Sequence, residues 1–303
     1  MNVLVLGGNG FIGSNLVAQL VAGDHKVRIY DRSSPRSREN LTSVEYLQGS
    51  LNDITSVSQA LYGIDIVFHL ISTSIPSTSN LSPADDVRDN LADTLTLLDC
   101  MRKMNIRRIL FISSGGTIYG ESEKELIDEE HPLNPKCSYG IVKLAVEKYL
   151  MMYKELYGFE PMILRVSNPY GPGQGKVGLQ GLIGTVLTNV IANEPVEIWG
   201  DGSVIRDYLY ISDLIQACML AIETSSIDTF NIGSGRGYTI NQVIQLVEEV
   251  CSCKIEVLHS EDRDIDINRV VLDIEKAKKE LGWEPNISIK EGLKKHYEWL
   301  QSL

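Results

Sequence analysis

The first two thirds of the sequence alternate between short apolar runs and longer amphipathic segments. Residues 2–6 form an apolar, β-branched run typical of a buried parallel strand, and an apolar-periodic segment follows the next glycines to about Val21. By the same criteria we expect strands at 26–30, 44–48, 64–70, 108–113 and 161–166, and helices at 53–61, 84–104 and 138–157. This succession predicts an α/β fold with a doubly wound parallel sheet, which binds ligands at the carboxyl ends of its strands.

The pattern changes after Pro169. The stretch 168–175 is rich in Gly and Pro, which indicates that the chain leaves the sheet there. Beyond it we expect helices at 178–193, 213–223 and 239–251, strands at 229–232 and 254–258, and two short helices at the end. We therefore predict a Rossmann domain at 1–168, to which 206–234 returns, and a smaller C-terminal α/β lid that occupies most of 169–303.

Glycines follow the first predicted strand with the spacing Gly7-x-x-Gly10-x-x-Gly13. Between a strand and a helix, such glycines allow a tight turn, close approach to a pyrophosphate and close packing of the helix on the sheet. Asp31 ends the second strand, where an acid can accept hydrogen bonds from ribose hydroxyls and repel a 2′-phosphate. The pattern therefore predicts NAD rather than NADP, although Arg32 stands beside Asp31.

Tyr139 and Lys143 stand one turn apart on the predicted helix 138–157. A nearby ammonium favours the phenolate, and a free tyrosine titrates near ~10, so a base at pH 7 needs a downward shift of roughly three units, about 4 kcal/mol. One lysine seldom supplies this much, so a second positive charge, such as an oxidised nicotinamide, is needed. The alternative is an ordinary amphipathic helix with a half-buried tyrosine and a solvated lysine.

The overall composition is that of an acidic globular protein. The 303 residues are 43% hydrophobic with a formal charge of −12, which argues against nucleic acid and anionic membranes as partners. No apolar run approaches the ~18 residues of a membrane span, and residues 1–6 lack the basic start of a signal peptide, so we expect neither. Five cysteines, an odd number, suit a reducing cytoplasm. Cys251 and Cys253 are too closely spaced for a zinc pair, and we expect no metal.

Motifs from both parts of the chain occur in one order: the glycines, Asp31, Asn90, Ser113-Ser114 before Tyr119-Gly120, the Tyr139–Lys143 pair, 164–172, Arg206-Asp207-Tyr208, 263–266 and 281–285. In this combination the sequence resembles the extended short-chain dehydrogenase/reductase superfamily. Within it, the sequence is similar to the NAD-dependent epimerase/dehydratase family, and most of all to UDP-glucose 4-epimerase-like enzymes. The resemblance covers essentially the whole chain.

The resemblance implies a 4-epimerase of a UDP-sugar that works through a 4-keto intermediate, with Tyr139 as acid and base. Asn168, Arg206 and Arg263 would hold the UDP diphosphate, and Asp266 would approach the uridine ribose. It also implies a set of cofactor contacts: Gly7, Gly10, Phe11, Ile12, Gly13, Asp31, Arg32, Leu51, Leu70, Asn90, Ser113, Tyr139 and Lys143.

A homodimer is implied as well, through helices 84–104 and 138–157. Their apolar stripes consist of Leu91, Leu95 and Leu98, and of Leu144, Tyr149 and Met152. The alternative is that these stripes only cover the sheet.

The sequence departs from this family at several positions. Gly115 stands where the family usually has Ser or Thr, whose hydroxyl bridges the tyrosine to the sugar O4. We expect Thr117 to replace that hydroxyl, also facing the substrate, and Ser114 to be the second choice. Ser50 replaces an acid that reads the adenine amino group, and Ser74 replaces a lysine near the cofactor.

Alternative functions remain open. In the same family, 4,6-dehydratases and decarboxylases carry acids just before the Val-Tyr-Gly segment, where this chain has Gly115, Gly116 and Thr117. A non-catalytic NAD-binding module is the third reading, suggested by the missing hydroxyl. The sugar is also open, because Val270 is intermediate between the bulky residue of glucose-specific epimerases and the small one that admits N-acetyl groups. UDP-Glc/UDP-Gal, UDP-GlcNAc/UDP-GalNAc and uronic acids all remain possible.

Overall fold

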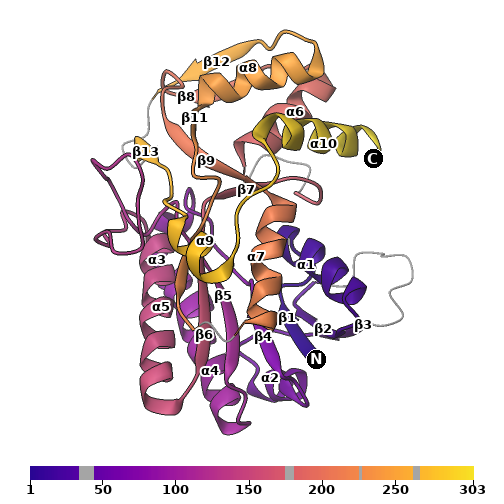
Figure 1. The fold of residues 1–303 in the computed structure, drawn as a ribbon, viewed down its shortest axis with the longest axis vertical. Coiled ribbons are helices and arrows are strands. Elements are labelled where there is room, and N and C mark those ends of the chain that lie inside the picture. The colour runs from indigo at the N-terminus through magenta and orange to yellow at the C-terminus, as the bar shows by residue number, and fades with distance from the viewer. Residues whose placement is uncertain (34–43, 175–180, 225–226, 262–266) are drawn as a thin grey trace.

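The structure, a computed structural model, describes residues 1–303 except 34–43, 175–180, 225–226 and 262–266. A seven-stranded parallel sheet forms its centre, in the order β10-β6-β5-β4-β1-β2-β3 (Figure 1). In chain order its strands are β1 (Asn2–Leu6), β2 (Lys26–Asp31), β3 (Val44–Gln48), β4 (Ile66–His69), β5 (Arg108–Ser114), β6 (Glu160–Val166) and β10 (Thr229–Ile232). The chain order reverses between β1 and β4, and this is where such sheets bind ligands.

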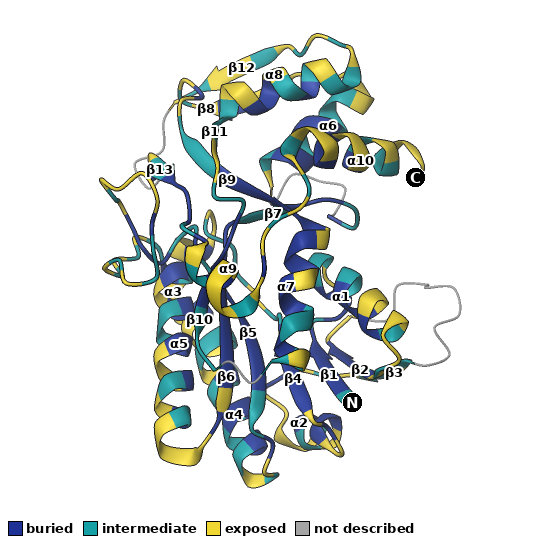
Figure 2. Ribbon diagram, in the orientation of Figure 1, coloured by how far each residue is buried: buried dark blue, intermediate teal, exposed yellow. Residues whose placement is uncertain are grey.

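Helices cover both faces of the sheet. Both faces need this cover because the strands are apolar on both sides, as β1 illustrates. Val3 and Val5 contribute to one core and Leu4 and Leu6 to the other. The strands of the large sheet are buried over most of their length (Figure 2). The first core contains α1 (Phe11–Ala22) and α7 (Ile211–Glu223). The second contains α2 (Ile54–Leu61), α4 (Asp93–Lys103) and α5 (Ser138–Tyr157). The predicted Rossmann sheet is thus confirmed.

The predicted helix 84–104 is divided into three parts. A short α3 (Pro83–Asp86) is followed by a π-helix, η2 (Val87–Ala92), and then by α4. The 3₁₀ turn η1 (Ser79–Leu81) precedes them. The π-helical turn places Asn90 so that its carbonyl accepts a hydrogen bond from the Thr94 hydroxyl at 2.5 Å. Apolar periodicity could not reveal this turn, and π-helical turns occur frequently at functional sites.

Apart from α9, which packs against β10 of the large sheet, the remaining elements form a smaller part above the carboxyl edge of that sheet (Figure 1). The strands β11, β9, β13 and β7 form one small sheet, and β8 pairs with β12. The bounds are β7 (Asn168–Tyr170), α6 (Leu182–Ala192), β8 (Val196–Trp199), β9 (Ile205–Tyr210), β11 (Gly237–Thr239), α8 (Ile240–Cys251), β12 (Val257–Ser260), β13 (Arg269–Val270), α9 (Glu275–Leu281) and α10 (Ile289–Gln301). The chain returns to the large layer through α7 and β10.

Asp207 connects the two parts. Its carboxylate is fully buried on β9 and accepts hydrogen bonds from the backbone of Ser234 at 2.7 Å and of Leu272 at 3.3 Å. Ser234 follows β10 of the large sheet, so the small sheet is fixed relative to the strand ends of the large one. Burial raises the pKa of Asp207, and these donors oppose the rise.

Helix α8 begins as predicted. The Thr239 hydroxyl accepts a hydrogen bond from the Gln242 amide at 3.0 Å, and the Gln242 side chain accepts one from the Thr239 amide at 2.9 Å. This reciprocal capping box satisfies two amides of the first turn. Within the described part of the chain, no helix combines the length and the apolar character needed to cross a membrane.

Candidate active site

The first turn of α5 carries the candidate base at the carboxyl edge of the sheet. Cys137 is the N-cap, and the amide of Ser138 donates a hydrogen bond to the Asn80 side chain at 2.9 Å. The Ser138 hydroxyl donates to Asp86 at 2.7 Å. Tyr139 follows directly, so these two bonds hold the turn that carries it.

Lys143 is buried one turn further along α5, with 6% of its surface exposed. Its ammonium donates a hydrogen bond to the Ile112 carbonyl of β5 at 2.9 Å. The ammonium lies 4.7 Å from the centre of the Phe111 ring and 5.6 Å from that of Tyr139. Burial lowers the pKa of Lys143 to about 8, because water no longer solvates the charged form.

The pKa of Tyr139 is raised, mainly because burial disfavours the phenolate. Cys137 and Asp86 raise it further, and a hydrogen bond with the Ser114 side chain opposes the rise. Lys143 is not among the groups that set this pKa, and in the protein alone the loss of solvation moves the pKa of Tyr139 upward, away from neutral pH. A base at neutral pH therefore needs more positive charge from a ligand than the sequence suggested.

The hydroxyl next to Tyr139 belongs to Ser114, at the end of β5, rather than to Thr117. The Thr117 hydroxyl is buried and has no hydrogen-bond partner among the described residues. Position 115 carries a glycine for a steric reason, since a Cβ there would lie 2.6 Å from a methyl group of Leu272. The segment around Leu272 thus leaves no room for a side chain on Gly115, and of the two candidate hydroxyls only that of Ser114 contacts Tyr139.

The glycine loop after β1 forms a tight cradle. Gly7 has a φ of +80°, which favours glycine, and a Cβ on Gly13 would overlap the Gly7 carbonyl oxygen. Asp31 is 9% exposed at the end of β2 and accepts hydrogen bonds from the amides of Asn9 at 3.1 Å and Ser33 at 3.0 Å. The loop, the N-terminus of α1 and this carboxylate therefore share one edge of the sheet.

The other predicted cofactor contacts are distributed along this edge. Asn90 joins the π-helix to the loop after β4, since its side chain accepts from the Thr73 amide and donates to Asp86, both at 2.8 Å. Leu51 is buried, whereas Leu70, Phe11 and Ile12 are half-buried and Arg32 is exposed. A small cavity beside them is lined by His69, Ser74, Asp86, Asn90, Tyr139 and Lys143.

Two of the predicted substrate residues lie on strands of the small sheet. Asn168 on β7 is half-buried and donates to the Asp207 carbonyl at 2.9 Å. Arg206 on β9 is half-buried and lies opposite Val270 of β13. Arg263 and Asp266 lie outside the described residues.

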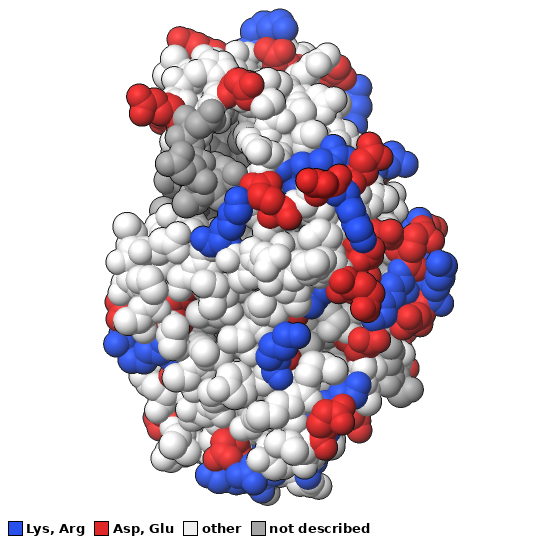
Figure 3. All heavy atoms as spheres, turned by 90° about the vertical axis from the view of Figure 1, so that its left-hand side faces the viewer, with Lys and Arg blue, Asp and Glu red and all other residues white. Residues whose placement is uncertain are grey.

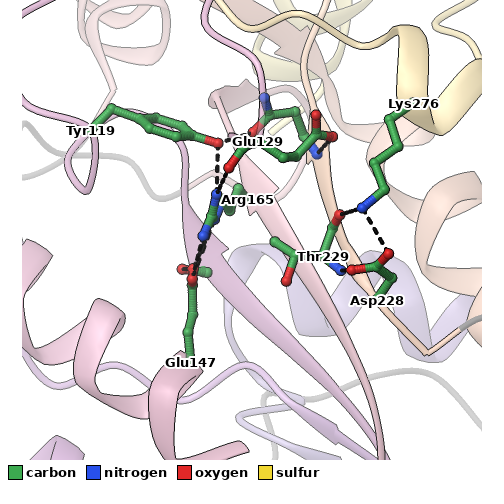
Figure 4. Close-up of polar contacts among 9 residues, drawn as sticks. Tyr119, Glu129, Glu147, Arg165, Asp228, Thr229 and Lys276 are labelled. Carbon is green, nitrogen blue, oxygen red and sulfur yellow. Dashed lines mark hydrogen bonds and ion pairs between the residues drawn. The ribbon is translucent and has the colours of Figure 1, made fainter. Parts of the chain in front are cut away.

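A buried ion pair between Arg165 of β6 and Glu147 of α5 was not predicted from the sequence (Figure 4). Their charged groups are 2.8 Å apart, and the side chains are 7% and 4% exposed. Ser113 also donates to Glu147, and Arg165 donates to the Tyr119 hydroxyl at 3.0 Å. The pair joins α5, one turn beyond Lys143, to the two strands beneath it. The signal in the sequence is a charged residue within an otherwise apolar strand.

Comparison with known proteins identifies the family. A model of the NAD dependent epimerase/dehydratase family matches residues 3–233. The chain belongs to this family. The sequence-based identification and the predicted cofactor, NAD, are thereby confirmed.

The similar proteins include several epimerases. A putative UDP-glucose 4-epimerase of Methanocaldococcus jannaschii is 33% identical over 302 residues, which cover 99% of this chain and 98% of the relative. The structure of a Thermotoga maritima UDP-glucose 4-epimerase with UDP-glucose has a TM-score of 0.95 at 36% identity, covering 100% of this chain and 99% of that one. A Thermus thermophilus UDP-glucose 4-epimerase in complex with NAD has a TM-score of 0.93 at 32% identity, covering 99% of each chain. Other matches are named as a reductase and a decarboxylase of sugar nucleotides.

The residues present fit NAD, as this family requires. The glycine cradle leaves no room for a Cβ at Gly13, and close backbone approach is what a pyrophosphate needs. Asp31 would hold the adenosine ribose, and Lys143 the nicotinamide ribose. NAD would supply a hydride acceptor there, beside the Tyr139–Lys143 pair.

We expect loss of Arg165 to destabilise the epimerase family fold strongly. Arg165→Met leaves the Glu147 carboxylate buried and uncompensated, which costs about 3–5 kcal/mol. The free energy of unfolding, measured by urea denaturation, checks this. The double variant Arg165→Met/Glu147→Leu also removes the unpaired Glu147 carboxylate. It should therefore recover much of the lost free energy of unfolding.

Lys124→Met is the matched control. Lys124 and Asp128 form an ion pair whose side chains are 55% and 40% exposed, and such pairs contribute about 0–1 kcal/mol. If Arg165→Met is no more destabilising than Lys124→Met, the buried pair does not hold α5 in place.

Proposed function

We propose that this protein is a NAD-dependent 4-epimerase of UDP-sugars that works through a 4-keto intermediate, with Tyr139 as acid and base. The observation that carries the proposal is the convergence of the Tyr139 phenol, the Ser114 hydroxyl and the buried Lys143 ammonium at one edge of the sheet. The epimerases among the similar proteins support the same activity.

Tyr139 would move one proton in each half of the reaction. As phenolate it accepts the proton of the C4 hydroxyl while C4 loses its hydride, and the sugar becomes a 4-ketone. Oxidised NAD, when bound, supplies the acceptor for that hydride and afterwards its donor. After the sugar has turned its other face, Tyr139 returns the proton to O4. Nothing is oxidised or reduced overall, so no further redox partner is needed.

Three groups would stabilise the phenolate that this scheme requires. The Lys143 ammonium lies over the Tyr139 ring, and Ser114 can donate a hydrogen bond to the phenolate oxygen. The positive charge of the oxidised nicotinamide would supply the remainder, since burial works against ionisation. Tyr139 would then accept the proton of the C4 hydroxyl only when the cofactor is oxidised and the site is filled.

The segment before Tyr119 favours an epimerase over the related activities. Gly115, Gly116 and Thr117 provide no carboxylate to protonate or deprotonate a C5 or C6 position, as a 4,6-dehydratase or decarboxylase requires. The intact Tyr139–Lys143 pair speaks against a non-catalytic NAD-binding module.

The anionic UDP group would be held locally, against an overall charge of −12. Arg206 and Arg263 would bind the diphosphate together with Asn168, because guanidinium groups match phosphate oxygens geometrically. Asp266 would approach the uridine ribose. We propose the UDP-Glc/UDP-Gal or the UDP-GlcNAc/UDP-GalNAc pair as substrates, since the intermediate size of Val270 admits either.

We further propose a homodimer through the exposed face of α5. Leu98, expected in this interface, lies on the inner face of α4, where it is fully buried and cannot contribute. On α5, by contrast, an apolar stripe is exposed: Ile141 at 54%, Tyr149 at 37%, Met152 at 38% and Leu156 at 63%. Figure 3 looks onto the side of α3 and α5, where charged side chains gather toward the rim and leave a broad area with few charges. Such a surface fits a second copy.

The cysteines support a reducing compartment, and we propose the cytoplasm. All five are free thiols, with Cys100 and Cys218 buried and the other three half-buried. Secreted proteins with several cysteines usually pair them in disulfides.

The activity is tested by incubating the NAD-loaded protein separately with UDP-Glc, UDP-GlcNAc and UDP-GlcA, and by following C4 epimers by NMR. We expect the 4-epimer from at least one of the first two. Tyr139→Phe is the matched control, which should bind NAD and UDP-sugar but lose turnover by at least about 10²-fold, since it lacks only the ionisable oxygen. Turnover within tenfold of wild type would remove Tyr139 as the base.

The two candidate hydroxyls are distinguished by Ser114→Ala and Thr117→Val. We expect Ser114→Ala to lower kcat by more than about tenfold with little change in KM, because a hydrogen bond that serves proton transfer strengthens in the transition state. Thr117→Val keeps the shape of the residue and should be mild. The opposite ranking would return the role to Thr117.

The dimer is tested by sedimentation at micromolar concentration. Wild type should sediment as a dimer, and Leu156→Glu as a monomer, because the change places a charge within the apolar stripe that the second copy would bury. Leu258→Glu is the control, since Leu258 is 48% exposed on β12, in the smaller part of the chain. A monomeric wild type would show that the stripe on α5 has no second copy to cover it.

A further inference from the structure

A buried carboxylate beside the Tyr139–Lys143 pair has no role in the chemistry described above. Asp86 ends α3, immediately before the π-helix, and is only 4% exposed. It lines the same small cavity as Tyr139 and Lys143. Burying a carboxylate costs free energy, so a buried carboxylate in a candidate active site indicates a specific role.

Asp86 accepts three hydrogen bonds from three different segments. One oxygen accepts from the Ser138 hydroxyl of α5 at 2.7 Å. The other accepts from the Ser74 hydroxyl at 2.7 Å and from the Asn90 side chain at 2.8 Å. These bonds join the first turn of α5 to the loop after β4 and to the π-helix. Displacing Asp86 would therefore release the turn that carries Tyr139.

We propose that Asp86 is a positioning residue of the active site, which fixes the first turn of α5 and places a negative charge beside the Tyr139–Lys143 pair. The proposal rests on the proposed role of Tyr139 as acid and base. The hydrogen bonds supply the positioning, and the low exposure makes the charge effective, since little water screens it.

The charge of Asp86 changes the pKa values of Tyr139 and Lys143, and the other titratable groups around the pair act on them too. Asp86 is the foremost group that favours the ammonium of Lys143, ahead of Glu147, whose charge Arg165 already balances. Asp86 also disfavours the phenolate of Tyr139, as does Cys137. His69 of β4 faces Lys143 but stays neutral, because burial and that ammonium lower its pKa to about 3.

Asp86 therefore raises the pKa of both members of the pair. Raising that of Tyr139 favours the neutral phenol, which is the form that returns the proton to O4. It also makes the phenolate depend on a positive charge brought by a ligand. Raising that of Lys143 keeps its ammonium charged at neutral pH despite burial. The carboxylate would thus couple the acid–base group to the occupancy of the site.

The test is the titration of Lys143 in the protein without substrate, followed by NMR of ¹³Cε-labelled lysine. The Lys143 signal is assigned by its loss in Lys143→Met, and wild type should titrate near 8. Asp86→Asn should lower this value by about one unit, since the opposite charge that favours the ammonium is lost. Asp86→Ser is a second neutral variant that keeps the measurement possible if the asparagine does not fold.

Asp85→Asn is the matched control. Asp85 precedes Asp86 on the same helix, but it is exposed and its carboxylate binds Ser82 and Arg88 outside the cavity. Its loss should leave the Lys143 titration unchanged. Ser138→Ala tests the positioning, since it removes one hydrogen bond and keeps the charge. It should lower kcat by several-fold and leave the Lys143 titration in place.

An unchanged Lys143 titration in Asp86→Asn overturns the proposed effect of the charge. A Ser138→Ala variant with wild-type kcat overturns the proposed positioning. In the active protein, the pH profile of kcat should move to lower pH in Asp86→Asn, since both pKa values fall. If no UDP-sugar is epimerised, the proposed function fails while the lysine titration still decides the role of the charge.

Discussion

The structure depends on burying the inner face of α5, which carries Tyr139, Lys143 and Glu147 at intervals of four residues. Burial of an ammonium or a carboxylate is costly unless each finds a partner. The strands beneath supply those partners, the Ile112 carbonyl for Lys143 and Arg165 for Glu147. The helix therefore fits in one register, because sliding it by one turn would separate each charge from its partner.

The same burial sets the chemistry of the site. It lowers the pKa of Lys143 and raises that of Tyr139, so it favours the neutral form of each group. With its pKa raised in this way, the Tyr139 phenol would not act as a base until a ligand brings positive charge beside it. The family binds a cofactor that is cationic when oxidised, which gives that charge a source at the adjacent edge of the sheet. Stability and the protonation of the site are thus governed by one property, the exclusion of water from the inner face of α5.

The sequence allowed the large sheet, the glycine loop and the Tyr139–Lys143 pair to be predicted, because each depends on local patterns. Strand β9 was missed, since Arg206 and Asp207 interrupt its apolar run, and its pairing with β7, β11 and β13 involves distant segments. The sequence indicated that Tyr139 needs a second positive charge, but not that burial raises its pKa. Sequence spacing shows that a lysine is near Tyr139. It does not show how far the neighbouring segments exclude water from the phenol.

The hydroxyl beside Tyr139 shows the same dependence on distant segments. Leu272 packs where a side chain on Gly115 would stand, and its amide is held by Asp207 of β9. Two residues earlier, Val270 lies opposite Arg206, at the position expected to influence the choice of sugar. One short segment of the smaller part therefore contacts both the acid–base site and the expected substrate site. A substitution in 270–272 that alters the choice of sugar should also alter the packing on Gly115, because Val270 and Leu272 are only two residues apart in the chain.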